Sequence, residues 1–358
     1  RGVSGRFPAG GTVDLGDGGT PTRFMIAAAC LAAAPVVVDG SPRMRERPVA
    51  EGVDLLRGLG AHLEYVESDG RLPVRITPSA SFAGGSIEVG RTASSQFVSA
   101  VMLVAPWLRD GVRVRYTDDP TSASYLELTR DVLRRWGVEV ERGDRADVVR
   151  PRAVRGRRFD VEPDASSQAY FAAATAVIAG ARATLPGIPK DSVQPDRRVL
   201  DHLATMGLRI DDAAEGDGVR CAAPRRPGPL RADLSLAPDG ALALAAACAM
   251  ADGVSELSGL RTLRVKETDR IAALATELRR IGCAAEATDD AITIDPSSRH
   301  AAPVVIETYN DHRMAMAFAV LGLARGGLAI ADPACVAKSY PTFWRDFGAM
   351  LAPPGRGS

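Results

Sequence analysis

The sequence predicts an α/β protein with two domains, each built from repeats of one structural unit. Three observations support this prediction: a strand, turn and apolar helix recur five times, an amphipathic helix follows each of the first four copies, and the chain has 358 residues. A chain of this length exceeds what one hydrophobic core usually organises, so two domains are expected.

Each of the five copies opens with a short strand, passes through a polar turn and enters a helix rich in small apolar residues. Successive copies start about 70 to 75 residues apart. The strands and turns are predicted at Val13-Asp14-Leu15 into Gly19-Thr20, Ile87-Glu88-Val89 into Ser94-Ser95-Gln96, Phe159-Asp160-Val161 into Ser166-Ser167-Gln168, Leu234-Ser235-Leu236 into Pro238-Asp239-Gly240, and Val305-Ile306-Glu307 into Asn310-Asp311-His312.

A second, amphipathic helix is predicted between successive copies. Its apolar residues recur at helical spacing and form a stripe that faces the core. Each stripe ends at a glycine, which permits the left-handed conformation that closes a helix. The stripes contain Val53, Leu56 and Leu59 before Gly60; Leu128, Val132 and Trp136 before Gly137; Val199, Leu203 and Met206 before Gly207; and Ile271, Leu274, Leu278 and Ile281 before Gly282.

A basic, turn-rich stretch at residues 149–158 separates the second copy from the third and predicts the domain boundary. The first domain, 1–158, then holds two copies, and the second, 159–358, holds three. Three copies in each domain would require six. We therefore expect that one copy is missing from the N-terminus, where the chain opens at Arg1 without an initiator methionine.

Composition argues against several classes of function. The formal net charge is zero, so no overall field attracts nucleic acid or an anionic membrane surface. The longest apolar stretch, 24–38, is too short to span a bilayer. The five cysteines are scattered without a CxxC pair, which argues against a disulfide framework or a zinc site and fits a reducing, cytoplasmic compartment.

The predicted helix starts and two basic segments indicate binding of anions. The first N–H groups of a helix are unpaired and carry partial positive charge. Segments 43–48 and 264–270 are predicted to open one helix each, and Lys266 and Arg270 would share a face. Cations there oppose the helix dipole, and an anionic ligand offsets that conflict. N-caps and solvated surface arginines are the alternative interpretation.

Familiar nucleotide motifs are absent from the sequence. It contains neither a GxxxxGK[ST] loop nor a GxGxxG after a strand, so nucleotide use is not indicated. Of the four histidines, only His312 lies among residues typical of a site, beside Asp311 and Arg313.

Several longer motifs resemble those of one enzyme family. The 5-enolpyruvylshikimate-3-phosphate synthases carry similar motifs in the same order, and the resemblance covers essentially the whole chain. The matching segments are 264–270 (RVKETDR), 309–316 (YNDHRMAM), 94–97 (SSQF), 15–20 (LGDGGT), 42–48 (PRMRERP) and 335–341 (CVAKSYP).

The resemblance implies a fold and a reaction. The fold would be two inside-out α/β barrel domains of three βαβαββ repeats each, of which five repeats are present here. The reaction would move the carboxyvinyl group of phosphoenolpyruvate to the 5-hydroxyl of shikimate 3-phosphate and release phosphate, a step toward chorismate and the aromatic amino acids. The resemblance implies no metal and no organic cofactor. We expect a monomer whose partners are these two small substrates.

The resemblance also implies roles for individual residues. Asp239 resembles the acid that handles the proton of the 5-hydroxyl, and Glu267 resembles the group that serves C3 of phosphoenolpyruvate. The shikimate 3-phosphate site is expected to contain Ser94, Ser95, Gln96, Ser122, Asp239 and Lys266. The phosphoenolpyruvate site is expected to contain Gly19, Arg43, Gln96, Arg270, His312, Arg313 and Lys338.

The sequence departs from the family pattern in several places. The family's N-terminal Lys-Ser motif and a nearby Arg have no counterpart, which leaves the activity of this exact chain open. Asp17 and Thr262 each stand where the family has Asn, and Phe24 follows Arg23 where Pro is usual. These three residues put substrate affinity and inhibitor sensitivity in doubt.

Two alternatives remain open at this point. The UDP-N-acetylglucosamine enolpyruvyl transferases share the fold but require a reactive cysteine on a mobile loop, whereas Cys30 lies in an apolar helix. A degenerate homologue that only binds ligand is favoured by the missing Lys. It is opposed by the presence of Asp239, Glu267, Arg313 and Lys338.

Overall fold

The computed structural model describes residues 9–189, 191–213 and 218–351. The chain divides into two compact units, Arg1–Asp160 (unit 1) and Val161–Ser358 (unit 2). Each unit is described by itself. The division into domains at residues 158 and 159 stays a prediction.

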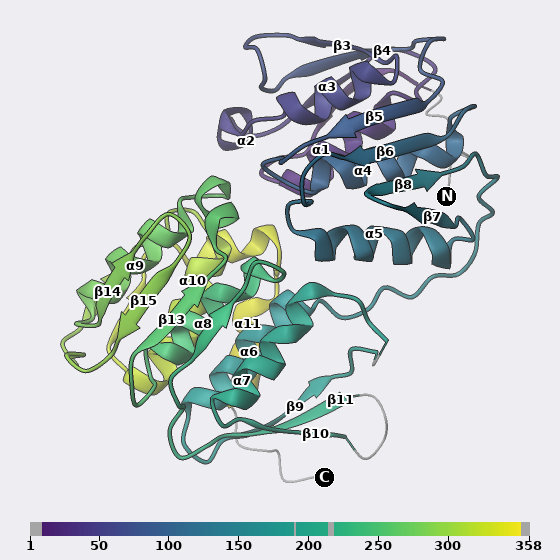
Figure 1. Cartoon of the computed structure of the whole chain (residues 1–358). Coiled ribbons are helices and arrows are strands. Elements are labelled where there is room, and N and C mark those ends of the chain that lie inside the picture. The colour runs from purple at the N-terminus through teal and green to yellow at the C-terminus, as the bar shows by residue number, and fades with distance from the viewer. Residues whose placement is uncertain (1–8, 190, 214–217, 352–358) are drawn as a thin grey trace. The chain divides into compact units, whose positions relative to one another are not determined.

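Unit 1 contains two four-stranded sheets of identical topology (Figure 1). In each sheet the first two strands are parallel, and the other pairings are antiparallel. The same strand order in both sheets is the structural counterpart of the sequence repeat. The orders are β1(Gly11–Asp14)-β2(Val36–Asp39)-β4(Val74–Thr77)-β3(His62–Tyr65) and β5(Gly85–Val89)-β6(Val112–Tyr116)-β8(Ala146–Val149)-β7(Val140–Gly143).

The helices of unit 1 alternate between apolar and amphipathic, as the repeat requires. The apolar helices α1 (Gly19–Ala29) and α4 (Gln96–Val104) pack against each other. The amphipathic helices α3 (Ala50–Gly58) and α5 (Ala123–Arg135) each bury one face. Two short elements complete the unit: α2 (Pro42–Glu46) and the 3₁₀ turn η1 (Ala105–Trp107).

Unit 2 repeats this plan in its middle sheet, which has the same strand order. The flanking sheets are smaller, with three antiparallel strands in one and two parallel strands in the other. The sheets are β10(Arg209–Asp212)-β11(Gly218–Ala222)-β9(Arg182–Pro186), β12(Arg231–Asp233)-β13(Ser255–Ser258)-β15(Ile292–Asp295)-β14(Ala284–Ala287), and β16(Val304–Ile306)-β17(Leu328–Ile330).

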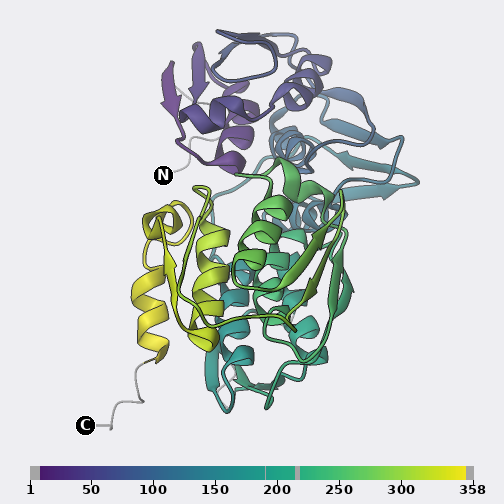
Figure 2. The ribbon, with the colours of Figure 1, turned by 90° about the vertical axis from the view of Figure 1, so that its left-hand side faces the viewer.

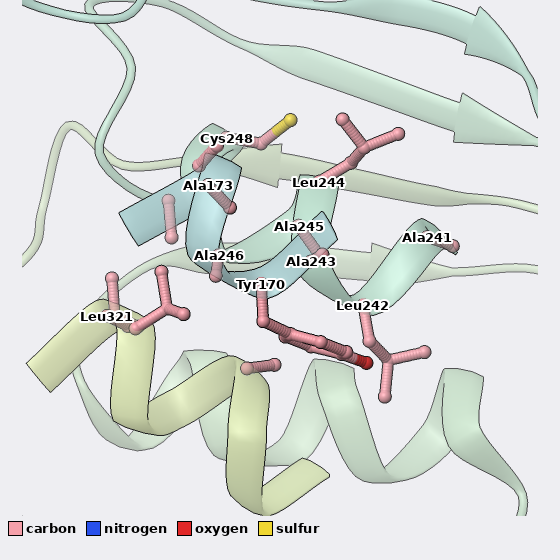
Figure 3. Close-up of a cluster of buried hydrophobic side chains, with 14 of the residues drawn as sticks. Tyr170, Ala173, Ala241, Leu242, Ala243, Leu244, Ala245, Ala246, Cys248 and Leu321 are labelled. Carbon is pink, nitrogen blue, oxygen red and sulfur yellow. The ribbon is translucent and has the colours of Figure 1, made fainter. Parts of the chain in front are cut away.

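Three apolar helices form the core of unit 2. They are α6 (Ala165–Val177), α8 (Ala241–Cys248) and α10 (His312–Arg325), which pack against one another and run side by side in Figure 2. Every residue of α8 is buried, as expected of a helix that is apolar all round. In Figure 3, side chains of α6, α8 and α10 gather in one cluster, which includes Tyr170 of α6, Leu321 of α10 and the alanines of α8.

The remaining elements of unit 2 surround this core. Helix α9 (Arg270–Arg280) lies between β13 and β14 of the middle sheet along the chain and carries the apolar stripe that the sequence predicts. The other helices are α7 (Arg198–Thr205) and α11 (Phe343–Leu351), and the 3₁₀ turns are η2 (Pro195–Arg197), η3 (Pro238–Gly240), η4 (Arg261–Val265) and η5 (Pro333–Lys338).

The predicted repeat is confirmed in the described residues, with two copies in unit 1 and three in unit 2. The glycine caps are also confirmed, because Gly60, Gly137, Gly207 and Gly282 all have positive φ. At Gly282 a side chain would also collide with the chain, since a Cβ would lie 2.6 Å from the carbonyl oxygen of Ser298.

Two of the five predicted strands are wrong or displaced. Residues 159–161 form no strand, because Phe159 stacks on Trp136 with ring centroids 5.7 Å apart and Val161 is 84% exposed. In the fourth copy the strand is β12 and ends at Asp233 rather than running through Leu236. There the side chain of Asp233 accepts a hydrogen bond from the N–H of Ser235 at 2.8 Å, which turns the chain.

The prediction that each basic segment opens a helix is also partly wrong. In the first segment α2 ends at Glu46, and α3 begins only at Ala50, so Pro48 lies between two helices. In the second segment Lys266 has a non-helical backbone at the end of η4, with φ of −83° and ψ of −148°, and α9 begins at Arg270. Lys266 and Arg270 therefore do not share a helix face. Among the described helices, none is both long and apolar enough to cross a bilayer.

Candidate functional site

Each unit carries one polar cluster where its apolar helices begin. In unit 2, four cations and three carboxylates gather at the starts of α8, α9 and α10. We call this group the unit 2 cluster: Asp239, Lys266, Glu267, Arg270, Asp311, Arg313 and Lys338.

Arg270, the first residue of α9, lies at the centre of the unit 2 cluster. Its side chain is 2% exposed. It donates to Asp311 from Nε at 2.7 Å and from Nη2 at 3.2 Å, to Asp239 at 2.9 Å and to Glu267 at 2.8 Å. A cation at a helix N-terminus opposes the helix dipole, and three carboxylates around one guanidinium offset that conflict.

Asp239 contacts three cations from one position. It lies in η3, directly before α8, and its side chain is 16% exposed. Besides Arg270, Lys266 lies 3.3 Å away and Arg313 lies 3.5 Å away. Burial opposes ionisation, but the charges of Lys266, Arg313 and Arg270 together lower the pKa of Asp239. The side chain is therefore a carboxylate at neutral pH.

Glu267 is held by a different set of cations. Its Oε2 accepts from Arg270, and its Oε1 accepts from the ammonium of Lys338 at 2.5 Å. Lys338 reaches it from η5, 71 residues along the chain. The side chain of Glu267 is 13% exposed. The two acids thus have separate environments but share Arg270, which is the arrangement needed to give two carboxylates different roles.

Asp311 caps α10 and is fully buried. It accepts from the backbone N–H of Arg313 at 2.8 Å and receives both hydrogen bonds from Arg270. The next residue, His312, is also buried. Burial and the nearby charges of Arg313 and Arg270 lower its pKa to about 4, so its imidazole is neutral at pH 7.

Asp196 lies behind the unit 2 cluster and was not predicted from the sequence. It belongs to η2 and accepts a hydrogen bond from the hydroxyl of Ser166. A Cβ on Gly240, beside Asp239, would lie 3.5 Å from Asp196 Oδ1. Burial and the charge of Asp239 raise the pKa of Asp196, so the environment favours its neutral form.

The polar cluster of unit 1 joins the starts of α1 and α4. We call it the unit 1 cluster: Gly19, Thr20, Arg23, Arg47 and Gln96. Gln96, the first residue of α4, donates to the hydroxyl of Thr20 at 2.7 Å and accepts from Arg23 at 2.6 Å. The guanidinium of Arg23 also lies over the ring of Phe97, 5.0 Å from its centroid. The two helices therefore begin side by side.

Arg47, rather than Arg43, is the arginine at the start of α1. A Cβ on Gly19 would lie 2.6 Å from Nη1 of Arg47, so only glycine allows this approach. Arg47 is 7% exposed. Arg43 forms an ion pair with Glu46, and its side chain is 44% exposed. The interruption between α2 and α3 at Pro48 determines which arginine faces inward, and the sequence alone does not reveal this choice.

The predicted phosphate-binding serines lie on two connected loops of unit 1. Ser94 and Ser95 precede α4, and Ser122 precedes α5 with a left-handed φ of 49°. The hydroxyl of Thr121 donates to the carbonyl of Thr92 at 2.6 Å and joins the two loops.

The helix starts differ in how their own side chains cap them. Gly18 before α1 and Ser95 before α4 make no side-chain cap hydrogen bond. In unit 2, by contrast, Asp164, Asp269 and Asp311 cap α6, α9 and α10 with their carboxylates. The dipoles of α1 and α4 thus lack a built-in anion, and these starts suit an anionic ligand.

The chemistry of the two clusters is that of anion binding and proton transfer. Among the described residues, no three His, Cys, Asp or Glu side chains form a group that could hold a metal ion. All five cysteines are free and buried, and burial raises the pKa of Cys30 and Cys248 to about 12. A buried thiol of high pKa is a poor nucleophile.

The structure brings most of the predicted site residues into the two clusters. Ser94, Ser95 and Ser122 lie on the loops that adjoin the unit 1 cluster, and His312 follows Asp311 directly. Arg43 faces solvent. Thr20, Arg23, Arg47 and Asp311 belong to the clusters without having been assigned to the site from the sequence, and Asp196 lies behind the unit 2 cluster. The individual assignments to substrates stay predictions.

Comparison with known proteins gives a consistent result. A family model described as EPSP synthase (3-phosphoshikimate 1-carboxyvinyltransferase) matches residues 1–347. A 3-phosphoshikimate 1-carboxyvinyltransferase from Methanoculleus marisnigri is 43% identical over 96% of this chain and 81% of its own length. A relative of the same name from Methanosphaerula palustris is 40% identical over 98% of this chain and 82% of its own length.

Solved structures agree on the fold. An EPSP synthase from Acinetobacter baumannii matches with a TM-score of 0.76 and 26% identity, over 95% of this chain and 78% of that one. An enolpyruvyl transferase from Streptomyces tendae matches with a TM-score of 0.60 and 18% identity, over 96% of this chain and 95% of that one, and bears on the fold alone. The predicted enolpyruvyl transferase fold is confirmed.

Proposed function

Because the chain belongs to the EPSP synthase family, we propose that it transfers the enolpyruvyl group of phosphoenolpyruvate to the 5-hydroxyl of shikimate 3-phosphate, with release of phosphate, and that the unit 2 cluster supplies the proton-transfer groups. The observation that supports placing this reaction at the unit 2 cluster is that Arg270 donates hydrogen bonds to both Asp239 and Glu267. Two acids far apart in sequence are held at one cationic centre.

The unit 2 cluster supplies cations for phosphoenolpyruvate. Arg313 and Lys338 are 13% and 19% exposed, so ligand can reach them, whereas Arg270 is 2% exposed. In this structure Arg313 forms an ion pair with Asp239, and Lys338 forms one with Glu267. An incoming phosphate or carboxylate would take over part of those contacts, since charged hydrogen bonds contribute about 1.5–3 kcal/mol each.

This exchange also gives Asp239 its role. Its pKa is held down by Lys266, Arg313 and Arg270 against the effect of burial. When substrate anions bind Lys266 and Arg313, the carboxylate loses part of that stabilisation and becomes a stronger base. It then accepts the proton of the 5-hydroxyl as the oxygen bonds to C2 of phosphoenolpyruvate.

Glu267 serves the carbon next to that bond. With Lys338 at 2.5 Å, it forms a pair that can deliver a proton to C3 and take one back. Addition of the hydroxyl and of this proton gives a tetrahedral adduct. Removal of a C3 proton then restores the double bond between C2 and C3, while the bond from C2 to the phosphate oxygen breaks and phosphate leaves.

The unit 1 cluster supplies an anion site. Its neutral donors are N–H and hydroxyl groups, and its cations are arginines. The starts of α1 and α4 have no carboxylate cap and offer backbone N–H groups, and Ser94, Ser95 and Ser122 lie on the adjoining loops. We assign these serines, with Gln96, to the phosphate of shikimate 3-phosphate. We assign Arg47, beside Gly19, to phosphoenolpyruvate in place of Arg43.

We further propose that the protein acts as a monomer in the cytoplasm. The five free, buried thiols support a reducing compartment. The buried thiols also disfavour the UDP-N-acetylglucosamine enolpyruvyl transferase alternative, which needs a reactive cysteine.

Phosphate release tests the proposed function. Each substrate is omitted in turn, and release is expected only when phosphoenolpyruvate and shikimate 3-phosphate are both present. Calorimetry on the same preparation measures whether each substrate binds. Binding of both without any release would select the degenerate, ligand-binding homologue instead.

A further inference from the structure

We propose that Glu277 is a positioning residue that holds the loop at residues 307–311, which leads into His312 and Arg313 at the start of α10. Glu277 lies on α9, outside the unit 2 cluster, and its side chain is 1% exposed. The inference rests on the proposed function, in which Arg313 binds phosphoenolpyruvate.

The loop at residues 307–311 has an unusual backbone. Tyr309 and Asn310 follow each other in the left-handed region, with φ of 56° and 54°. Asn adopts this region with some ease, but a bulky residue such as Tyr rarely does. Two such residues in a row persist only when their surroundings hold them. The loop ends at Asp311 and leads directly into His312 and Arg313, so its shape sets the start of α10.

Glu277 makes two of the contacts that hold this loop. The backbone N–H of Glu307 donates to its Oε2 at 3.2 Å, and the hydroxyl of Tyr309 donates to its Oε1 at 2.9 Å. Burying a carboxylate without hydrogen-bond donors would lower the stability of the folded chain. The folded state therefore favours keeping both contacts. The exposed Arg280 completes the set with an ion pair at 2.7 Å.

The same helix holds the other end of the loop. Arg270 lies seven residues before Glu277, two helical turns along α9, and grips Asp311 with two hydrogen bonds. A rigid helix therefore fixes the loop at 307, 309 and 311. Arg270 also contacts both Asp239 and Glu267, whereas the polar contacts of Glu277 among the described residues are with the loop and with Arg280. We therefore expect Glu277 to act on the site through the loop.

This geometry predicts a selective defect. Glu277→Gln keeps the size of the side chain but replaces one acceptor oxygen with a donor. Tyr309→Phe keeps the ring, which is 40% exposed, and removes only the hydroxyl. Each change should raise KM for phosphoenolpyruvate about 5- to 30-fold, while KM for shikimate 3-phosphate changes less than about twofold. Arg280→Gln removes the exposed ion pair on the same carboxylate and serves as the matched control.

The experiment measures both KM values and the melting temperature for the wild type, the three single variants and the Glu277→Gln, Tyr309→Phe double variant. Because both changes break the same hydrogen bond, the double variant should lose less than the product of the single effects. Calorimetry with phosphoenolpyruvate in the presence of shikimate 3-phosphate gives the same comparison without turnover.

The outcomes separate this inference from the proposed function. A selective rise in KM for phosphoenolpyruvate in Glu277→Gln and Tyr309→Phe, absent in Arg280→Gln, supports the positioning role. Lower melting temperatures with both KM values unchanged would overturn it and leave Glu277 as a purely structural residue. If Glu277→Gln does not fold, Tyr309→Phe decides. A wild-type chain that neither binds nor converts the substrates contradicts the proposed function itself.

Discussion

Arg270 and Asp311 form a fully buried, two-point ion pair that ties the start of α9 to the start of α10. Nε donates to Oδ2 at 2.7 Å, and Nη2 donates to Oδ1 at 3.2 Å. Asp311 is 0% exposed. Removing one partner of a buried pair leaves the other without compensation, and that loss is far larger than the net gain from the intact pair. The pair is therefore a structural requirement of the site.

The first prediction concerns this pair. Arg270→Met should lower the free energy of unfolding by about 3–5 kcal/mol, because Asp311 stays buried without its partner. Arg264→Gln is a control at the same helix start, where an ion pair with Asp269 is 29% and 38% exposed. An exposed pair contributes about 0–1 kcal/mol. Urea unfolding of both variants measures the difference, and equal losses would show that the buried pair is not special.

The second prediction concerns the two acids. Glu267→Gln and Asp239→Asn should each lower kcat by about 10²–10⁴-fold, because each removes a positioned proton-transfer group. Shikimate 3-phosphate binding should fall much less in Glu267→Gln, since Glu267 is assigned to the other substrate. Steady-state phosphate release and calorimetry measure the two effects. Near-normal turnover in both variants would remove the catalytic assignment.

The third prediction compares two arginines four residues apart. Arg47→Gln should raise KM for phosphoenolpyruvate about 10- to 100-fold, the equivalent of one lost charged hydrogen bond. Arg43→Gln should have the smaller effect, since Arg43 faces solvent and pairs with Glu46. Measured side by side, a larger defect at Arg43 would restore the prediction made from the sequence and refute the one made from the structure.

The fourth prediction concerns pH. Burial and two nearby arginines lower the pKa of His312 from 6.5 to about 4, so folding favours the neutral imidazole. The unfolded chain binds this proton first as pH falls, so His312 contributes stability above pH 6.5 that is lost between about 6.5 and 4. The pKa of Asp239 lies below its usual 3.8, so its contribution is lost only at lower pH.

Melting temperatures across pH 4 to 6.5 measure this effect in the wild type and in His312→Gln. The variant should melt with a shallower pH dependence over that window, because it lacks the proton-binding group. Identical slopes in the two proteins would mean that His312 is not held neutral by the fold.

Much of the fold could be predicted because its signals are local. Apolar periodicity and a terminal glycine such as Gly60 or Gly282 mark each amphipathic helix without reference to distant residues. The predicted strand of the third copy was wrong because tertiary packing determines the structure there. Phe159 stacks on Trp136 instead of pairing with a neighbouring strand, and no local pattern predicts that contact.

The site was predictable where a motif names its residues and unpredictable where packing selects among similar ones. Arg270 joins Asp239 and Glu267, and Lys338 pairs with Glu267, while the roles that the family resemblance implies for them stay predictions. Arg43 and Arg47 carry the same charge, and only the chain turn at Pro48 decides which one is buried. From the sequence, Glu277 cannot be distinguished from any other acid on an amphipathic helix, because the loop that it holds lies 30 residues later in the chain.

The central claim is that Asp239 and Glu267 transfer protons during addition and elimination at phosphoenolpyruvate. Its most direct test is the reaction in D₂O, with the product followed by proton NMR. Because Glu267 delivers a solvent-derived proton to C3 and later removes one, deuterium should appear in the vinyl group of the product. Glu267→Gln should lose product and deuterium together. Phosphate release with a vinyl group that carries no deuterium, or no enolpyruvyl product from the wild type, would contradict it.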